Sequence, residues 1–259
     1  MKRRKFIILT SLSSVLSIEL NSCSTQKVQP VVLTVSAAGV YRNCLAEIDL
    51  RYKKEKPNVI ITYNIAGSGF LRQQIEQGAS VDIYIPGIAK EMDILETQGL
   101  IVPNTRQNLT INSIVIITHK DSKLPISSFK NLIDKDVKRV AVGAGTVSAG
   151  IYTKEGLNFF GIYEQVRQKS VVAEEDIRQV LKQVESHSVD VGITYETESK
   201  ISNLVKTVAV APQNSHQPVI SPLAILKSCQ NISAAKDFIK FLISTQVKPL
   251  FEKYGFTNI

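Results

Sequence analysis

The sequence predicts an α/β protein made of two doubly wound lobes, joined by two crossing segments, with a ligand cleft between them. Short runs rich in β-branched residues alternate with stretches of helical length, and this alternation is typical of parallel sheets with crossover helices. The alternating set occurs twice, and no linker rich in Pro, Gly and Ser separates the two sets. A second lobe must therefore be joined to the first by segments that cross between them.

The first set of elements begins with a strand at Val31–Val35, which a small-residue turn at 36–39 follows. A helical stripe runs over Cys44–Tyr52 before the segment that ends in Pro57, a residue that cannot continue a helix. The remaining elements of this set are the strands Val59–Tyr63 and Val81–Ile85 and the helices Phe70–Glu76 and Ala89–Gln98.

The second set begins with the β-branched run Ser113–Thr118. Its helix after Glu175 carries Ile177, Val180, Leu181 and Val184 at the spacing of one buried stripe. The other expected strands are Arg139–Val142, Ser170–Val172, Val189–Thr194, Val205–Val210 and Val219–Leu226, and the other helices are Ser148–Phe160, Glu175–Ser186, Ala234–Leu242 and Thr245–Tyr254. We expect one lobe to comprise 31–112 plus 216–259, and the other 113–215.

The N-terminus has the organisation of an export signal. Four basic residues precede a short, Ser-rich apolar stretch, and Leu20–Cys23 resembles a bacterial lipobox in which Cys23 becomes the lipidated first residue. The apolar stretch is too short to favour a spanning helix, for which roughly 20 apolar residues are needed. We expect residues 1–22 to be a signal peptide, by the general or the twin-arginine route, and the protein to lie in the periplasm or on the outer face of the cytoplasmic membrane, anchored through Cys23.

Composition argues against several other classes. The formal net charge is +8, but no basic block with interleaved aromatic residues follows the signal segment, so we expect no nucleic-acid partner. The spacing of the three His and three Cys residues matches no metal motif, and no protein-held metal is predicted. Cys44 and Cys229 are expected to be buried, unpaired thiols, although an oxidising compartment leaves a disulfide open.

The loop 143–150 is the strongest candidate for an anion site, because it leads from an apolar strand into a helix. Unpaired backbone N–H groups and the positive end of the helix dipole meet at such a place. A dinucleotide fingerprint with Glu174 or Glu175 as the ribose acid is the alternative, but Ser148 stands at the third glycine position and no P-loop lysine follows. A small anion is therefore favoured over a nucleotide.

Catalytic motifs are weak by comparison. Ala66–Phe70 lacks the first glycine of a nucleophile elbow, and no His is tied to a nucleophile by spacing. Ser68 is expected either to cap a helix or to offer its N–H and hydroxyl to a ligand oxygen. An exported α/β enzyme that uses Ser68 or Tyr195 is kept as an alternative from another class.

Several segments, taken in order, resemble the periplasmic molybdate-binding proteins of ABC importers. They are Leu33–Gly39, Tyr52–Lys56, Arg72–Ile83, Ser148–Glu155, Glu175–Arg178, Val191–Tyr195 and Phe251–Thr257. The resemblance spans about Leu33 to Thr257 and implies the type II periplasmic binding protein fold. It also implies a monomer without a cofactor, which binds molybdate or tungstate and delivers it to a permease and its ATPase.

The resemblance also implies a binding site. By position it comprises Ser68, the N–H groups of Ala149 and Ile177, and the hydroxyl of Tyr195. The first serine of the family's site falls at Val40 here, so only the Val40 N–H remains as a donor. Arg42 is either an extra charged donor or a solvated residue. Vanadate or sulfate is therefore the alternative ligand. A cavity lined only by donors would disfavour monohydrogen phosphate by roughly 1–3 kcal/mol, because its O–H would lack an acceptor.

Overall fold

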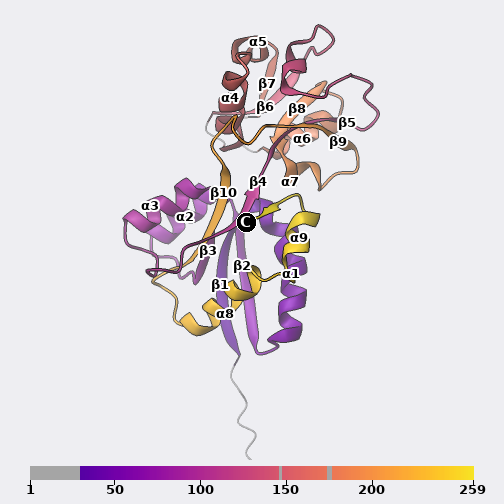
Figure 1. Ribbon diagram of the computed structural model, residues 1–259. Coiled ribbons are helices and arrows are strands. Elements are labelled where there is room, and N and C mark those ends of the chain that lie inside the picture. The colour runs from indigo at the N-terminus through magenta and orange to yellow at the C-terminus, as the bar shows by residue number, and fades with distance from the viewer. Residues whose placement is uncertain (1–29, 146–147, 174–176) are drawn as a thin grey trace, which may run out of the picture.

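The computed structural model describes residues 30–145, 148–173 and 177–259 (Figure 1). The expected signal peptide, Cys23, Glu174 and Glu175 lie outside these residues. Within the described part of the chain, no helix combines the length and the apolar character that crossing a bilayer requires.

The first sheet has six strands in the order β11-β4-β10-β3-β1-β2. Strand β1 pairs in parallel with both β2 and β3, as the sequence predicted for these three runs. Strand β10 is antiparallel to β3 and β4, so the sheet is mixed. The bounds are β1 Val31–Ala38, β2 Val59–Ala66, β3 Ile83–Ile85, β4 Gln107–Asn112, β10 Val219–Ile225 and β11 Thr257–Asn258.

The second sheet has five strands in the order β7-β6-β8-β5-β9. Strand β6 pairs in parallel with β7 and β8, whereas β5 is antiparallel to β8 and β9. The bounds are β5 Ile114–His119, β6 Val140–Gly143, β7 Ser170–Ala173, β8 Val191–Tyr195 and β9 Val205–Val210. The predicted two-sheet α/β class is confirmed, and both sheets contain antiparallel strands beside their parallel centres.

Helices cover both faces of the first sheet (Figure 1). One apolar core joins it to α1, α8 and α9, and a second core joins it to α2 and α3. Helices α4, α5 and α6 share the core of the second sheet. The helical segments are η1 Gly39–Tyr41, α1 Arg42–Glu55, α2 Ser68–Glu76, α3 Ala89–Thr97, η2 Phe129–Ile133, α4 Ser148–Phe159, α5 Tyr163–Arg167, α6 Arg178–Glu185, α7 Glu196–Ser199, α8 Ile232–Leu242 and α9 Lys248–Lys253.

Two expectations about local structure were wrong. The segment Ser36–Ala38 continues β1 rather than forming a turn, because its small side chains are buried between β2 and β3. Ser68 does not cap α2: Gly67 holds the cap position, and Ser68 is the first helical residue.

Two crossings join the sheets. Strand β4 passes into β5 through Ser113, and β9 returns to β10 through residues 211–218. The crossings lie together, since Asn112 at the end of β4 pairs with Val219 at the start of β10. Figure 1 shows the two sheets as separate bodies connected at this neck, with the C-terminus beside it.

Candidate functional site

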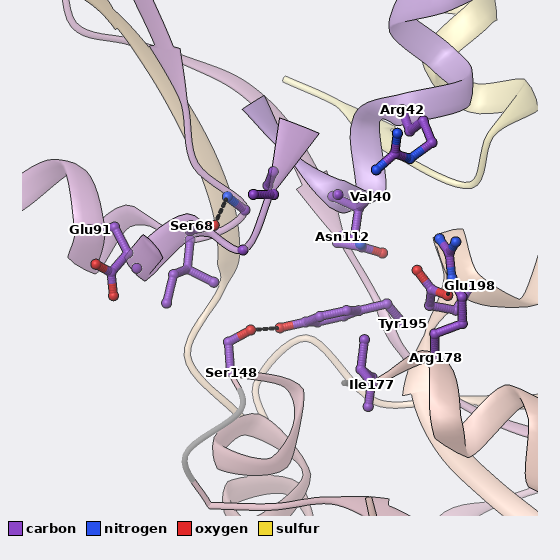
Figure 2. A pocket seen from close by; sticks show the side chains of 17 residues that line it. Val40, Arg42, Ser68, Glu91, Asn112, Ser148, Ile177, Arg178, Tyr195 and Glu198 are labelled. Atoms are coloured by element: carbon purple, nitrogen blue, oxygen red, sulfur yellow. Dashed lines mark hydrogen bonds and ion pairs between the residues drawn. The ribbon is translucent and has the colours of Figure 1, made fainter. Parts of the chain in front are cut away.

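A cavity of about 540 Å³ lies between the two sheets, close to the crossings. Segments that follow the carboxyl ends of parallel strands from both sheets line it, which is where open α/β sheets bind ligands. Its lining residues are Ala38, Gly39, Val40, Arg42, Ala66, Gly67, Ser68, Gly69, Gly87, Ile88, Glu91, Asn112, Ser148, Ile177, Arg178, Tyr195 and Glu198. Figure 2 draws the side chains of these residues around the cavity and labels ten of them.

The wall from the first sheet is built by three strand ends. Strand β1 leads into η1 with Val40, β2 leads into α2 with Ser68, and β3 leads to Gly87. The Gly87 N–H donates to the Ser68 hydroxyl oxygen at 3.0 Å. Because this contact uses a lone pair, the proton of the Ser68 hydroxyl stays available for an acceptor in the cavity.

The wall from the second sheet carries a hydroxyl pair. Tyr195, the last residue of β8, donates its phenolic hydrogen to the hydroxyl oxygen of Ser148 at 2.9 Å, and Ser148 begins α4 (Figure 2). Burial raises the pKa of Tyr195 well above its ordinary value, and the bond to Ser148 lowers it less. The phenol is therefore protonated at neutral pH and remains a neutral donor.

Ile177 is among the residues that line the cavity, whereas Ala149 is not. Ile177 lines it from the cap position of α6. Ala149 is fully buried at the second position of α4, where a backbone N–H has no partner within its own helix, and its neighbour Ser148 provides the cavity wall. The resemblance assigned no ligand role to Ser148, whose hydroxyl faces the cavity.

A close approach of two backbones fixes the start of α4. A Cβ atom on Gly150 would lie 2.1 Å from the carbonyl oxygen of Ala144 and 2.4 Å from that of Gly143. No side chain fits at this distance, so Gly150 allows α4 to begin directly against the end of β6. The helix end is thereby held beside the cavity.

Charged groups line the cavity from both sheets and contradict the expectation of a lining made only of donors. Glu198 is 3% exposed, and the Arg178 guanidinium Nε lies 3.2 Å from its carboxylate. Glu91 binds Arg72 Nε at 2.7 Å. Arg42 is exposed and extends toward the cavity from the first turn of α1 (Figure 2). The lining therefore holds two arginines and two glutamates, whose charges balance.

Asn112 also lines the cavity, at the crossing between the sheets. Its side-chain amide donates to the Thr197 hydroxyl at 2.9 Å and its carbonyl oxygen accepts from the Ser113 N–H at 2.9 Å. Sequence reasoning did not select it. A polar residue inside the mostly β-branched segment Leu109–Ile117 is the signal that could have done so.

The other expectations about reactive groups concern metals and thiols. Among the described residues, no group of three or more His, Cys, Asp or Glu side chains could hold a metal ion. Cys44 and Cys229 are free and buried, as predicted. Burial raises the pKa of each thiol to about 12, so both are protonated and unreactive at neutral pH.

Two α/β lobes that share a cavity at their strand ends and are joined by two crossings define the periplasmic binding protein type II class. The chain belongs to the family of bacterial extracellular solute-binding proteins, whose model matches residues 33–257.

Individual relatives agree with this assignment. The chain is 35% identical over 250 residues to the putative ABC transporter substrate-binding lipoprotein YvgL of Bacillus subtilis, covering 96% of this chain and 95% of YvgL. It is 35% identical to the molybdate-binding protein ModA of Escherichia coli, covering 87% and 88% of the two chains. The substrate-binding domain of a putative molybdenum ABC transporter from Clostridium difficile superposes with a TM-score of 0.81 at 35% identity, covering 88% of this chain and 99% of that domain.

Proposed function

We propose that this protein is the solute-binding component of an ABC importer and that it captures a tetrahedral oxyanion, molybdate or tungstate. The observation that carries the proposal is that hydroxyl donors from both lobes, Ser68 on one and the Ser148–Tyr195 pair on the other, line one cavity. The names of the relatives in E. coli and C. difficile support molybdate as the ligand.

The proposed ligand contacts are neutral. They are the hydroxyls of Ser68 and Tyr195, the Tyr195 hydrogen turning from Ser148 to the anion, and the backbone N–H groups of Val40, Ala149 and Ile177. Each of these N–H groups lies at or next to the first residue of a helical segment, where the backbone donors are unpaired and the helix dipole is positive. Arg42 adds a charged donor at the rim. Because the charges of the lining residues balance, directed donors rather than net charge would hold the anion.

The size of the cavity supports closure on binding. A five-atom oxyanion occupies the volume of a few water molecules, each about 30 Å³, far less than the 540 Å³ between the sheets. We propose that residues 31–112 plus 216–259 and residues 113–215 are two lobes that approach each other around the anion. The closed form would be the state that the permease recognises.

The partners and the anchor are proposals of the same kind. A membrane permease and its cytoplasmic ATPase would receive the anion from a monomeric binding protein. Cys23 would carry the lipid that holds the protein at the outer face of the cytoplasmic membrane, a role that the lipoprotein name of the B. subtilis relative supports.

The experiment is a ligand screen by thermal shift and calorimetry on protein freed of bound anions. Molybdate and tungstate should raise the melting temperature by mass action, and Ser68→Ala should weaken their binding. Sulfate, vanadate and phosphate measure selectivity. Ser36→Ala is the matched control, because it removes a buried hydroxyl that does not line the cavity. If no tetrahedral oxyanion binds the wild type, the proposal is wrong.

A further inference from the structure

A buried pair of hydroxyl residues beneath the cavity joins β4 and β10, the two strands of the first sheet that meet the crossings and are called the crossing strands below. Thr110 on β4 and Ser221 on β10 are direct partners in the antiparallel register. Both are at most 1% exposed, and neither lines the cavity. The strand register shifts immediately after Ser221, so the ladder is irregular at this point.

Hydrogen bonds connect this pair to the Val40 and Gly87 segments of the wall from the first sheet. The Tyr41 hydroxyl lies 2.6 Å from the Thr110 hydroxyl, and Tyr41 directly follows Val40. Ser221 donates to the Gly87 carbonyl oxygen at 3.0 Å. The Gly87 N–H in turn donates to Ser68 at 3.0 Å.

One hydroxyl hydrogen of this set has a fixed direction. The Gly87 carbonyl can only accept, so the single hydroxyl hydrogen of Ser221 is committed to it. The Tyr41 and Thr110 hydroxyls share one hydrogen bond, in which either oxygen can be the donor. Burial raises the pKa of Tyr41 well above its ordinary value, which keeps the proton on the phenol. The backbone pairing of Thr110 with Ser221 joins these two hydrogen bonds.

We infer that Thr110, Tyr41 and Ser221 form a positioning network, which sets the spacing between the Val40 loop and Ser68 from the crossing strands. The inference rests on the proposed oxyanion site. Tyr41 holds one side of the wall and Gly87 the other, so a change in the Thr110–Ser221 pair moves the two sides relative to each other. The network therefore couples the geometry of the crossings, which must change when lobes close, to the donors that contact the anion.

Stacking holds the Tyr41 ring independently of its hydroxyl. The ring lies parallel to Phe256 at 4.7 Å and edge-on to Phe251 at 6.4 Å. Tyr41→Phe therefore removes the hydroxyl that contacts Thr110 while leaving the ring packing in place. It is the second variant, in case Ser221→Ala does not fold.

The test compares Ser221→Ala and Tyr41→Phe with Ser36→Ala, a buried serine on β1 whose hydroxyl has no partner among the described residues. Molybdate affinity and the ratio of molybdate to sulfate affinity are measured by calorimetry. Both network variants should bind molybdate about five- to thirty-fold more weakly, which equals about 1–2 kcal/mol at 1.4 kcal/mol per tenfold, and should change the ratio. Ser36→Ala should do neither.

A second measurement needs no ligand. Hydrogen exchange of the Gly87 amide, which the network holds against Ser68, should become faster in ligand-free Ser221→Ala than in wild type or Ser36→Ala. The inference would be overturned if the folded network variants bound molybdate with wild-type affinity and their Gly87 amide exchanged at the wild-type rate. It would also be overturned if Ser36→Ala lost as much molybdate affinity as the network variants. Failure of the wild type to bind any oxyanion would overturn the proposed function, and the exchange measurement would then decide the network alone.

Discussion

Gly150 and Gly156 lie on the same helix and should respond in opposite directions to the same substitution. Alanine is favoured over glycine inside a helix by about 1 kcal/mol, so propensity alone would stabilise both variants. A Cβ on Gly156 would meet only the Ser215 hydroxyl oxygen, at 3.8 Å, which is an ordinary contact. Gly156→Ala should therefore raise the free energy of unfolding by up to about 1 kcal/mol.

At Gly150 the same substitution should instead lower the free energy of unfolding. Its Cβ would be 2.1 and 2.4 Å from two backbone oxygens, which cannot rotate away as a flexible side chain could. The start of α4 must shift from the end of β6. Overpacking of this kind typically costs about 1–3 kcal/mol, which exceeds the gain in propensity. Gly150→Ala should have a lower free energy of unfolding than wild type, and Gly156→Ala a higher one.

The shift of α4 in Gly150→Ala should also weaken ligand binding. Ser148 is two residues before Gly150, and its hydroxyl is bonded to Tyr195, so movement of α4 separates the two groups. A loss of about 1.4 kcal/mol in binding corresponds to a tenfold weaker affinity. Urea unfolding with a common m-value gives the stability difference, and calorimetry with molybdate gives the affinity.

Equal stability and affinity of Gly150→Ala and wild type would refute the reasoning about close approach. A comparable loss in Gly156→Ala would show instead that α4 tolerates no added methyl group, whatever its surroundings.

Three further predictions concern the cavity wall and three buried phenols. Val40→Ser should tighten molybdate binding roughly two- to twelvefold by calorimetry, since one added hydrogen bond contributes about 0.5–1.5 kcal/mol; unchanged or weaker binding would place this side chain outside the anion contacts. Arg42→Gln should weaken binding at low salt and much less at 1 M salt, where the Debye length is about 3 Å; a loss independent of salt would indicate a direct contact instead. Burial raises the pKa values of Tyr195, Tyr41 and Tyr84 above the ordinary 10.0. Their contribution to the free energy of unfolding should therefore be complete below about pH 10 and should be lost above it, by about 1.4 kcal/mol per pH unit for each phenol. Alkaline unfolding curves of the matching Phe variants should be less steep than that of wild type; equally steep curves would contradict this.

The sequence made the parallel centres of both sheets predictable because these strands are buried on both faces. Runs such as Val81–Ile85 and Val189–Thr194, which contain the wholly buried strands β3 and β8, are rich in β-branched residues for that reason. Strand β4, Gln107–Asn112, was not predicted. Its polar sequence carries no such signal, and it exists as a strand through antiparallel pairing with β10, more than a hundred residues later.

Residues of the candidate site were predictable where a single strand end and its loop indicate them. They were not predictable where the position of a side chain depends on a contact with a distant segment. Ser68 and Tyr195 follow strand ends that the sequence shows, and both line the cavity. The Ser148 hydroxyl acquires its orientation from a residue 47 positions away, and Asn112 from Thr197, 85 positions away. Such contacts depend on the crossings, which local patterns do not specify.

The balance of charge in the lining explains why position 40 matters. The lining holds two arginines and two glutamates, so its formal net charge is zero, and each directed donor would contribute a larger share of the anion affinity. The second lobe supplies a hydroxyl pair on one wall, whereas the first lobe supplies Ser68 and, at Val40, only a backbone N–H. An anion held by fewer donors from the first lobe would depend more strongly on the exact placement of Ser68. The buried network beneath Gly87 determines that placement, so selectivity among oxyanions in this protein should respond to the crossing strands as well as to the cavity wall.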